Sequence, residues 1–325
     1  MNARRTAHHT LLLPASVDGL RLDQALARLF DQYSRSMLKD WIDAGQVRVN
    51  GQALKPRARV ATGDAVEVTA TLDAAGELEA QPVDFTVLHA DEALIVIDKP
   101  VGLVVHPGAG NPDQTLVNGL LARYPELAAL PRAGLVHRID KDTSGLLVAA
   151  RTPQAFQRLV KALARREIHR RYLAVVNGVL IAGGTIDAAI GRDPQQRTRM
   201  RVMEGGREAV THFLVARRFR AHSLLEVELE TGRTHQIRVH LAWRGYPLVG
   251  DSRYGARPHL PPDADEDLRA ALRGFGRQAL HAWQLELEHP VNREPLFFEA
   301  PPPADFVALV DALQADLDAH GETAR

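Results

Sequence analysis

The densest group of reactive side chains in the sequence is the run HRIDKDTSG at residues 137–145. It brings together two carboxylates, two cations, one imidazole and two hydroxyls. So many reactive groups in one short connection are typical of a functional loop, because binding and catalytic residues are often carried by loops on a rigid scaffold. Asp, Thr, Ser and Gly are also common turn residues, so by composition alone a polar surface turn is an equal alternative.

Asp140 is the candidate for chemistry within this run. An aspartate can act as a nucleophile, as a general base or as an ion-pair partner. In a partly buried site it stays ionised when a cation or hydrogen-bond donors lie nearby. A second dense segment, TGRTHQIRVH at residues 231–240, supplies Arg233 and Arg238 as candidate cations. The alternative for these two arginines is the solvated start of a helix.

Several other kinds of site have no signature in the sequence. It lacks the glycine-rich phosphate loops of nucleotide-binding proteins and the H-E-x-x-H metal motif, and Ser144 has no G-x-S-x-G turn. His235 and His240 are five residues apart, which does not place them on one face of a helix. The sequence contains no cysteine. We therefore expect no metal, no nucleotide cofactor and no serine or cysteine nucleophile.

The overall charge is balanced, but its distribution is not. Lys and Arg number 40, and Asp and Glu number 40. Eight arginines against three acids lie between Arg192 and Arg220, and four more lie between Arg165 and Arg171. From Glu299 onward there are six acids and one base. Because the planar fork of arginine suits phosphate, the basic zones are candidate contacts for a nucleic-acid backbone.

No stretch of the sequence reaches the roughly 20 apolar residues that a membrane helix requires. The basic first residues are followed by Leu11–Leu13, a run that stops at Pro14 and is too short for a secretion signal. The absence of cysteine fits a reducing compartment. We therefore expect a cytoplasmic protein without a membrane segment.

Two groups of elements must position these residues, and 325 residues allow two domains. The first group, from Leu20 to about Thr71, predicts a small module. Apolar residues at 22, 25, 26 and 29 predict one face of a helix, and a second helix is expected after Ser34. Strands are expected at 47–49 and 65–69, with a hairpin turn at Asn50-Gly51.

The second group is larger and follows a small, acidic stretch at 72–81, which predicts a linker. Apolar strands are expected at 94–97, 133–136, 146–150, 172–176, 211–215 and 224–230, and helices at 115–124, 156–163 and 306–317. The two kinds of element are interspersed without regular βαβ alternation. We therefore predict an α+β fold in which helices flank a mixed, largely antiparallel sheet.

The N-terminal module resembles the S4 RNA-binding domain over its whole length, from RLDQALA to GDAVEV. The resemblance implies an RNA surface on the second helix and on the turn after it. The cations at matching positions are Arg35, Lys39, Arg48, Lys55 and Arg57. The alternative for these side chains is a solvated, exposed face.

Six motifs of the larger domain resemble, in order, those of the RluA family of RNA pseudouridine synthases. They are DKPVGLVVHPG, HRIDKDTSGLLVAA, RYLAVV, TGRTHQIRVHLA, LVGDSRYG and LHA. The resemblance covers about residues 18–320. It implies an S4-like domain at 18–75, a linker at 76–82 and a catalytic domain with a C-terminal helix at 83–325. Ile139 stands where the family usually has leucine, a swap that conserves volume.

The resemblance also implies a role for individual residues. Asp140 matches the essential aspartate, which attacks the nucleotide or stabilises the ribose while the N1–C1′ bond breaks, before the uracil re-attaches through C5. Arg238 matches the arginine that pairs with this aspartate, and Tyr172 matches the tyrosine that packs against the base. Arg138 matches the arginine that fills the space left by the flipped uridine, and Ile237 would form an apolar wall.

His137 is a further candidate, either for substrate binding or for a hydrogen bond that fixes the loop. The implied reaction is an isomerisation within one nucleotide, for which no cofactor is expected. Details such as VVHPGAGNPD and ETGRTHQIRVH are most similar to family members that act on 23S large-subunit rRNA. They imply the stem-loop called helix 69, with uridines 1911, 1915 and 1917 as targets.

Two alternatives stay open at this point. One is an enzyme of the same family that acts on other rRNA or tRNA uridines. The other is an RNA-binding ribosome-assembly factor without catalysis. The implied partner is 23S rRNA or a large-subunit ribosomal particle, and we expect a monomer.

Overall fold

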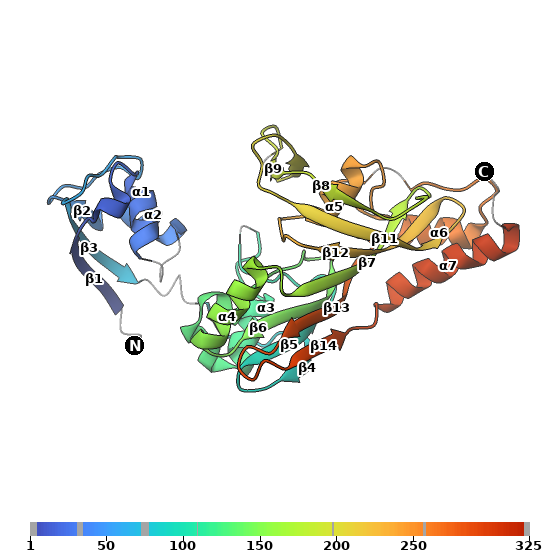
Figure 1. Cartoon of the computed structure of the whole chain (residues 1–325), viewed down its shortest axis with the longest axis horizontal. Coiled ribbons are helices and arrows are strands. Elements are labelled where there is room, and N and C mark those ends of the chain that lie inside the picture. The colour runs from blue at the N-terminus through green and yellow to red at the C-terminus, as the bar shows by residue number, and fades with distance from the viewer. Residues whose placement is uncertain are drawn as a thin grey trace. The chain divides into compact units, whose positions relative to one another are not determined.

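The structure, a computed structural model, describes residues 5–30, 35–72, 78–108, 110–196, 198–255 and 258–321. The chain forms two compact units, Met1–Glu79 and Ala80–Arg325 (Figure 1). Ser34, Arg197 and part of the expected linker lie outside the described residues.

In its described part, the N-terminal unit combines a three-stranded antiparallel sheet with two helices. The strands have the order β1-β3-β2. The elements are β1 (Arg5–Leu12), α1 (Leu22–Leu29), α2 (Arg35–Asp43), β2 (Val47–Val49) and β3 (Ala65–Leu72). One apolar cluster joins the helices to the sheet, so this unit has a core of its own.

The predicted face of helix α1 is confirmed, because Leu22, Ala25 and Leu26 are fully buried. The predicted turn is also present, since Asn50 and Gly51 have φ angles of 50° and 77°. Residue 18, the expected start of the module, lies after strand β1, which pairs with β3 along its length. The residues of β1, RTAHHTLL, do not alternate between apolar and polar. The sequence pattern therefore did not predict this strand, which the pairing with β3 defines.

The second unit is organised around one large sheet that contains nine of its strands in the described part of the chain. The order is β4-β5-β6-β13-β7-β12-β11-β8, and β14 pairs with β13. Only the pairing of β6 with β13 is parallel among those described, so the predicted mixed, largely antiparallel sheet is confirmed. The strands are β4 (Thr86–Ala90), β5 (Leu94–Lys99), β6 (Ser144–Ala150), β7 (His169–Asn177), β8 (Gly184–Asp187), β11 (Val210–Arg218), β12 (His222–Leu229), β13 (Leu280–Glu288) and β14 (Pro295–Glu299).

Helices cover both faces of this sheet (Figure 1). They are α3 (Leu116–Arg123), α4 (Pro153–Ala164), α5 (Gln236–Trp243), α6 (Glu266–Gly274) and α7 (Ala304–His320). A separate hairpin pairs β9 (Ile190–Arg192) with β10 (Met200–Val202). Within the described ranges, none of the helices combines the length and apolar character needed to cross a membrane.

Alternation along the strands assigns each helix to a face. In β7, Tyr172 and Ala174 belong to the apolar cluster shared with α3 and α5. The next residue, Val175, belongs to the cluster shared with α6 and α7. Since successive side chains of a strand point to opposite faces, α3 and α5 lie on one side of the sheet and α6 and α7 on the other. Tyr172 therefore faces α5.

The strand predicted at 133–136 is wrong. A short 3₁₀ segment, Pro131–Gly134, occupies this position, and Leu135 forms a single bridge with Ala149. Arg132, Ala133 and Gly134 all have positive φ angles, of 55°, 50° and 76°. A Cβ on Gly134 would lie 2.0 Å from the carbonyl oxygen of Ala150. Close packing against β6 thus turns the chain where its apolar residues alone suggest a strand.

Candidate active site

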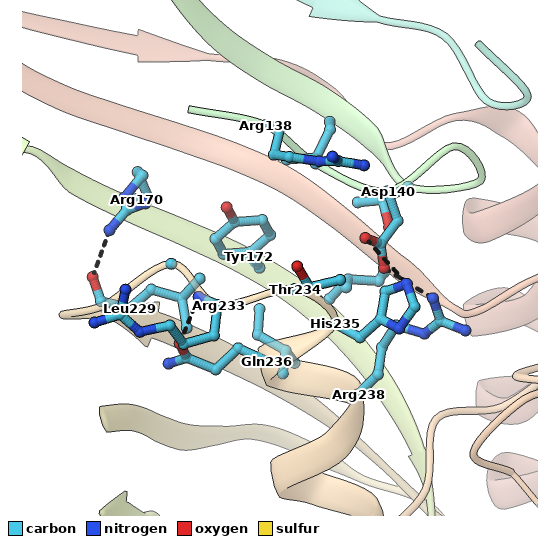
Figure 2. Close-up of a pocket in the computed structure, with 15 residues that line it drawn as sticks. Arg138, Asp140, Arg170, Tyr172, Leu229, Arg233, Thr234, His235, Gln236 and Arg238 are labelled. Carbon is cyan, nitrogen blue, oxygen red and sulfur yellow. Dashed lines mark hydrogen bonds and ion pairs between the residues drawn. The ribbon is translucent and has the colours of Figure 1, made fainter. Parts of the chain in front are cut away.

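A pocket on the α5 face of the sheet contains the dense run of reactive residues (Figure 2). The loop before β6, strand β7, the end of β12 and the start of α5 form it, and its volume is about 80 Å³. Six residues singled out from the sequence line it, namely Arg138, Asp140, Tyr172, Arg233, Ile237 and Arg238. The tertiary structure therefore brings together residues that are up to 100 positions apart, as the numbers 138 and 238 show.

The centre of the pocket is an ion cluster in which one guanidinium serves two carboxylates. Arg238 donates from Nη1 to Oδ2 of Asp140 at 2.8 Å. Its Nε and Nη2 donate to Oδ2 and Oδ1 of Asp251 at 2.7 and 2.9 Å. Burial by itself would raise the pKa of Asp251, but the hydrogen bonds from Arg238 lower it overall. Arg238 thus holds Asp140, and the fully buried carboxylate of Asp251 in turn holds Arg238 in place.

The start of helix α5 is built so that Arg238 faces Asp140. The Oε1 of Gln236 accepts from the backbone N–H of Arg233 and from the hydroxyl of Thr231, at 3.0 and 2.8 Å. Its Nε2 donates to the carbonyl of Val210 at 2.9 Å. Arg233, the other candidate cation, donates instead to the carbonyl of Glu208. Of the two arginines proposed from the sequence, Arg238 is the one that pairs with Asp140.

The remaining walls of the pocket are apolar and aromatic, with cations among them. Tyr172 is 4% exposed, and burial raises the pKa of its hydroxyl. Figure 2 shows its ring between Arg170 and Asp140. Ile237 is buried, as an apolar wall requires, whereas Arg138 is exposed at the edge of the pocket. Arg170, which sequence reasoning missed, is buried and donates to the carbonyl of Leu229.

The loop that carries Asp140 is fixed at both ends by hydrogen bonds. His137 does not line the pocket, and its Nε2 accepts from the backbone N–H of Val148 at 3.2 Å. Burial lowers the pKa of His137 to about 3, so the imidazole is neutral and can accept this bond. Of the two roles open for His137, the hydrogen bond that fixes the loop is the one that the geometry supports.

Lys99 also holds the loop that carries Asp140. Its side chain is fully buried, and Nζ donates to the carbonyls of Pro100, Leu103 and Lys141 at 2.7 to 2.9 Å. Three carbonyl oxygens match the three donors of an ammonium group. Burial nevertheless lowers the pKa of Lys99 to about 7, while Asp142 and Asp140 oppose this shift.

The two hydroxyls of the loop are bound to the segment before and at the start of β13. Thr143 Oγ1 accepts from Gln278 Nε2 at 3.1 Å, and Ser144 Oγ lies 2.9 Å from His281 Nδ1. Arg277 donates to the carbonyl of Asp142 at 3.2 Å and forms a bidentate pair with Asp305 on α7. The two hydroxyls therefore support the loop. Arg277 connects the same loop to α7.

The expected basic zone between Arg192 and Arg220 divides into two parts. Arg220 forms a buried pair with Asp316 at 2.8 Å, and Arg218 donates to the carbonyl of Leu180. These arginines hold the fold together. Arg201 and Arg207, on and after the β9–β10 hairpin, are exposed. The cations available for a nucleic-acid backbone are thus those nearer the hairpin.

The second basic cluster is largely paired with acids. Arg166 forms ion pairs with Glu208 and Glu230, and Arg171 lies 3.4 Å from Glu228. Arg165 is exposed, with Glu167 at 3.9 Å. These contacts reduce the charge that this cluster can offer to RNA, which the linear sequence does not reveal.

In the N-terminal unit, a groove of about 630 Å³ is lined by several of the cations matched to the S4 domain. Lys39, Lys55 and Arg57 lie along it, and Lys39 pairs with Asp43. Arg48 is exposed and donates to the carbonyl of Gly51. Arg35 opens helix α2, and its side chain is outside what the structure describes.

Across the described residues, no three His, Cys, Asp or Glu side chains come together as metal ligands would. Sequence reasoning missed three residues around the central pair, namely Asp251, His235 and Lys99. Asp251 lies in the motif LVGDSRYG and Lys99 in DKPVG, so both were within recognised segments. Nothing in the sequence indicated that Asp251 pairs with Arg238 or that Lys99 binds the carbonyl of Lys141.

Known proteins are similar to both units of this chain. A model of the RNA pseudouridylate synthase family matches residues 93–243, which contain Asp140, Tyr172 and Arg238, and an S4 domain model matches residues 20–66. The solved structure of human RNA pseudouridylate synthase domain containing 4 has a TM-score of 0.56 and 27% identity, and the match covers 70% of this chain and 92% of that one. The fold and the matched domain define an RNA pseudouridine synthase with an N-terminal S4 domain.

Curated relatives are similar over nearly the whole chain. One from Xanthomonas campestris pv. campestris is 52% identical over 97% of this chain and 95% of its own length. One from Pseudomonas aeruginosa is 50% identical over 94% of this chain and 96% of its own. Both have the name ribosomal large subunit pseudouridine synthase D. The chain belongs to the RNA pseudouridylate synthase family.

Proposed function

We propose that this enzyme isomerises uridines of large-subunit ribosomal RNA to pseudouridine, with Asp140 as the catalytic residue. One observation carries the substrate assignment. About half of the residues are identical, over more than nine tenths of the chain, to those of relatives that are named for this RNA. The observation that carries the catalytic role is the pairing of Asp140 with Arg238 inside a pocket.

In this proposal, each side of the Asp140 carboxylate has a separate task. Arg238 holds Oδ2 and keeps the group ionised and oriented. Oδ1 meets the target nucleotide while the N1–C1′ bond breaks. Tyr172 supports the base, and the buried Ile237 forms the apolar wall beside it. Arg138, exposed at the edge, enters the stack in place of the flipped uridine.

The finer target that we propose is helix 69 of 23S rRNA, as the family resemblance implies. The exposed arginines of the β9–β10 region and the groove of the N-terminal unit would bind the RNA backbone around it. A map of pseudouridines in total RNA, from cells with and without the gene, tests this target. Loss of modification in helix 69 is the expected result, and loss confined to another RNA would contradict it.

The catalytic role is tested by Asp140→Asn, with Asp142→Asn in the same loop as the matched control. We expect Asp140→Asn to abolish product and to leave RNA binding near normal, because the amide keeps the shape but loses the charge. Asp142→Asn should stay active, since Asp142 braces the loop through its carbonyl. Product formation by the Asp140→Asn enzyme at the parental rate would refute the proposed mechanism.

A further inference from the structure

His235 stands beside the central pair in an unusual backbone conformation. It immediately precedes helix α5 and has a φ angle of +57°, in the left-handed region that few side chains adopt. This conformation directs the imidazole into the pocket, where Nε2 lies 3.8 Å from Oδ1 of Asp140 (Figure 2). Oδ1 is the oxygen that Arg238 leaves free, because Arg238 binds Oδ2.

The other imidazole nitrogen has a partner that determines the tautomer. Nδ1 of His235 lies 2.7 Å from the hydroxyl of Tyr254. The same hydroxyl accepts the backbone N–H of Met200 at 2.9 Å. The phenol retains its own proton to donate, and we assign that proton to the contact with Nδ1. In a neutral imidazole the hydrogen is then on Nε2, the nitrogen that faces Asp140.

The surroundings favour this neutral, protonated-at-Nε2 form. Burial lowers the pKa of His235, and Arg238 and Arg253 lower it further, while Asp140 and Asp251 oppose them. Burial also raises the pKa of Tyr254, so that its hydroxyl keeps its proton. With these two pKa shifts, each group from Met200 through Tyr254 to His235 can donate to the next, and His235 can donate to Asp140.

From these contacts we propose that His235 is a positioning residue that donates from Nε2 to Oδ1 of Asp140 during the reaction, with Tyr254 fixing its tautomer. The proposal rests on the catalytic role proposed for Asp140. The separation of 3.8 Å exceeds a hydrogen bond, and such bonds are often long before the reacting complex forms. Together with Arg238, His235 would orient the carboxylate, and the second lone pair of Oδ1 stays open to the target nucleotide.

The same chain of bonds connects the carboxylate to the basic hairpin. Met200, which donates to Tyr254, is the first residue of β10. The guanidinium of Arg199 lies 5.2 Å from the centre of the Tyr254 ring. A hydroxyl held by the hairpin therefore controls which nitrogen of His235 faces Asp140.

Two substitutions of His235 separate its donor from its backbone role. His235→Asn retains a residue that tolerates positive φ, but its amide is too short to take the place of Nε2. His235→Gln can place an amide N–H near the position of Nε2. Tyr254→Phe removes the proton that fixes the tautomer. Tyr246→Phe, outside the pocket lining, is the matched control for loss of a hydroxyl.

The measurement is single-turnover tritium release from C5-labelled uridine in large-subunit rRNA, taken from cells that lack the gene. We expect His235→Asn to lower the rate about 10- to 100-fold, the equivalent of one hydrogen bond to a charged group. His235→Gln should recover part of this loss. The rate of Tyr254→Phe should lie between those of His235→Asn and the parent, and Tyr246→Phe should have the parental rate. RNA affinity should be unchanged throughout.

A pH profile distinguishes positioning of Asp140 from a structural effect. Loss of a donor to the carboxylate should move the acid limb of the His235→Asn profile to higher pH. A parental rate and profile for His235→Asn would overturn the proposal, as would a loss of RNA affinity without a loss of rate. An Asp140→Asn enzyme that remains active would refute the proposed function instead, whatever the His235 variants do.

Discussion

At the scale of single residues, the site depends on one guanidinium with two carboxylate partners. Arg238 gives one nitrogen to Asp140 and two to Asp251. The backbone N–H groups of Arg253 and Tyr254 also donate to Asp251, at 2.9 and 3.0 Å. Because these bonds exist independently of the substrate, Arg238 is already oriented when the nucleotide enters the pocket.

Asp251→Asn should therefore reduce both stability and activity. The amide cannot offer two anionic oxygens to Arg238, and a buried guanidinium would lose most of its compensation. Removing one partner of a buried pair typically costs about 3–5 kcal/mol. We expect a decrease of that order in the free energy of unfolding, measured by urea denaturation, together with loss of most product formation.

The matched control for Asp251→Asn is Glu288→Gln, which breaks an exposed pair with Arg293. An exposed pair contributes about 0–1 kcal/mol, so this variant should unfold near the parental urea concentration. Equal effects of the two variants would contradict a stabilising role for the buried cluster.

At the scale of elements, the loop that carries Asp140 is fixed where β6 and β13 run parallel. Ser144 and Gly145 pair with His281 and Ala282 of β13. Gly145 has a φ angle of +108°, and a Cβ there would lie 2.1 Å from the carbonyl oxygen of Ala282. The close approach of these two strands positions the residues on either side of the reactive run.

Gly145→Ala should therefore separate β6 from β13 and disturb the Asp140 loop. We expect a lower yield of folded protein or a large loss of stability, because the clash is with backbone and cannot be relieved by a side-chain rotation. Gly102→Ala is the control, since Gly102 also has a positive φ angle but has no atom within 4 Å of the added Cβ. Its cost should be about 1–2 kcal/mol, from backbone strain alone.

Thermal unfolding followed by circular dichroism compares these two glycine variants. A Gly145→Ala protein as stable as Gly102→Ala would show that β6 and β13 can move apart without harm. In that case the close approach of the two strands would not be the reason for glycine at position 145.

At the scale of the whole molecule, each unit has a core of its own, and the second unit contains buried histidines that bear on acid stability. His222 is fully buried in β12, and burial lowers its pKa to about 4. Burial likewise lowers the pKa of His137 to about 3. In the unfolded chain both groups would titrate near 6.5.

Folded stability should therefore fall as the pH drops below 6.5. Between that pH and the lower folded pKa values, the unfolded chain binds protons that the folded chain excludes, so acid favours unfolding. At pH 5.5 each histidine should cost about 1 kcal/mol relative to pH 7.5. Urea denaturation at the two pH values measures the effect.

His222→Gln separates this histidine from the other titrating groups of the chain. The variant cannot be protonated at position 222, so its stability relative to the parent should improve by about 1 kcal/mol between pH 7.5 and 5.5. A constant difference between variant and parent over this range would be inconsistent with a neutral, buried His222.

The sequence by itself determined much of the fold and the centre of the site. Periodic apolar residues predicted helix α1 and most strands of the large sheet, because burial on one face is recorded locally. The density of reactive residues singled out Asp140 in its loop, and Arg233 and Arg238 in a second dense segment, as candidates for chemistry. The resemblance to a known family added Tyr172, Ile237 and Arg138, all of which line the same pocket.

The tertiary structure decided which further side chains meet. It placed Arg238 against Asp140, as the family resemblance implied, and it alone brought Asp251 and His235 beside them and directed Arg233 to the carbonyl of Glu208. It also tied some arginines of the basic zones to carboxylates or carbonyl groups. The physical reason is that hydrogen bonds and ion pairs depend on strand order and register, which join residues 98 positions apart, as Asp140 and Arg238 are.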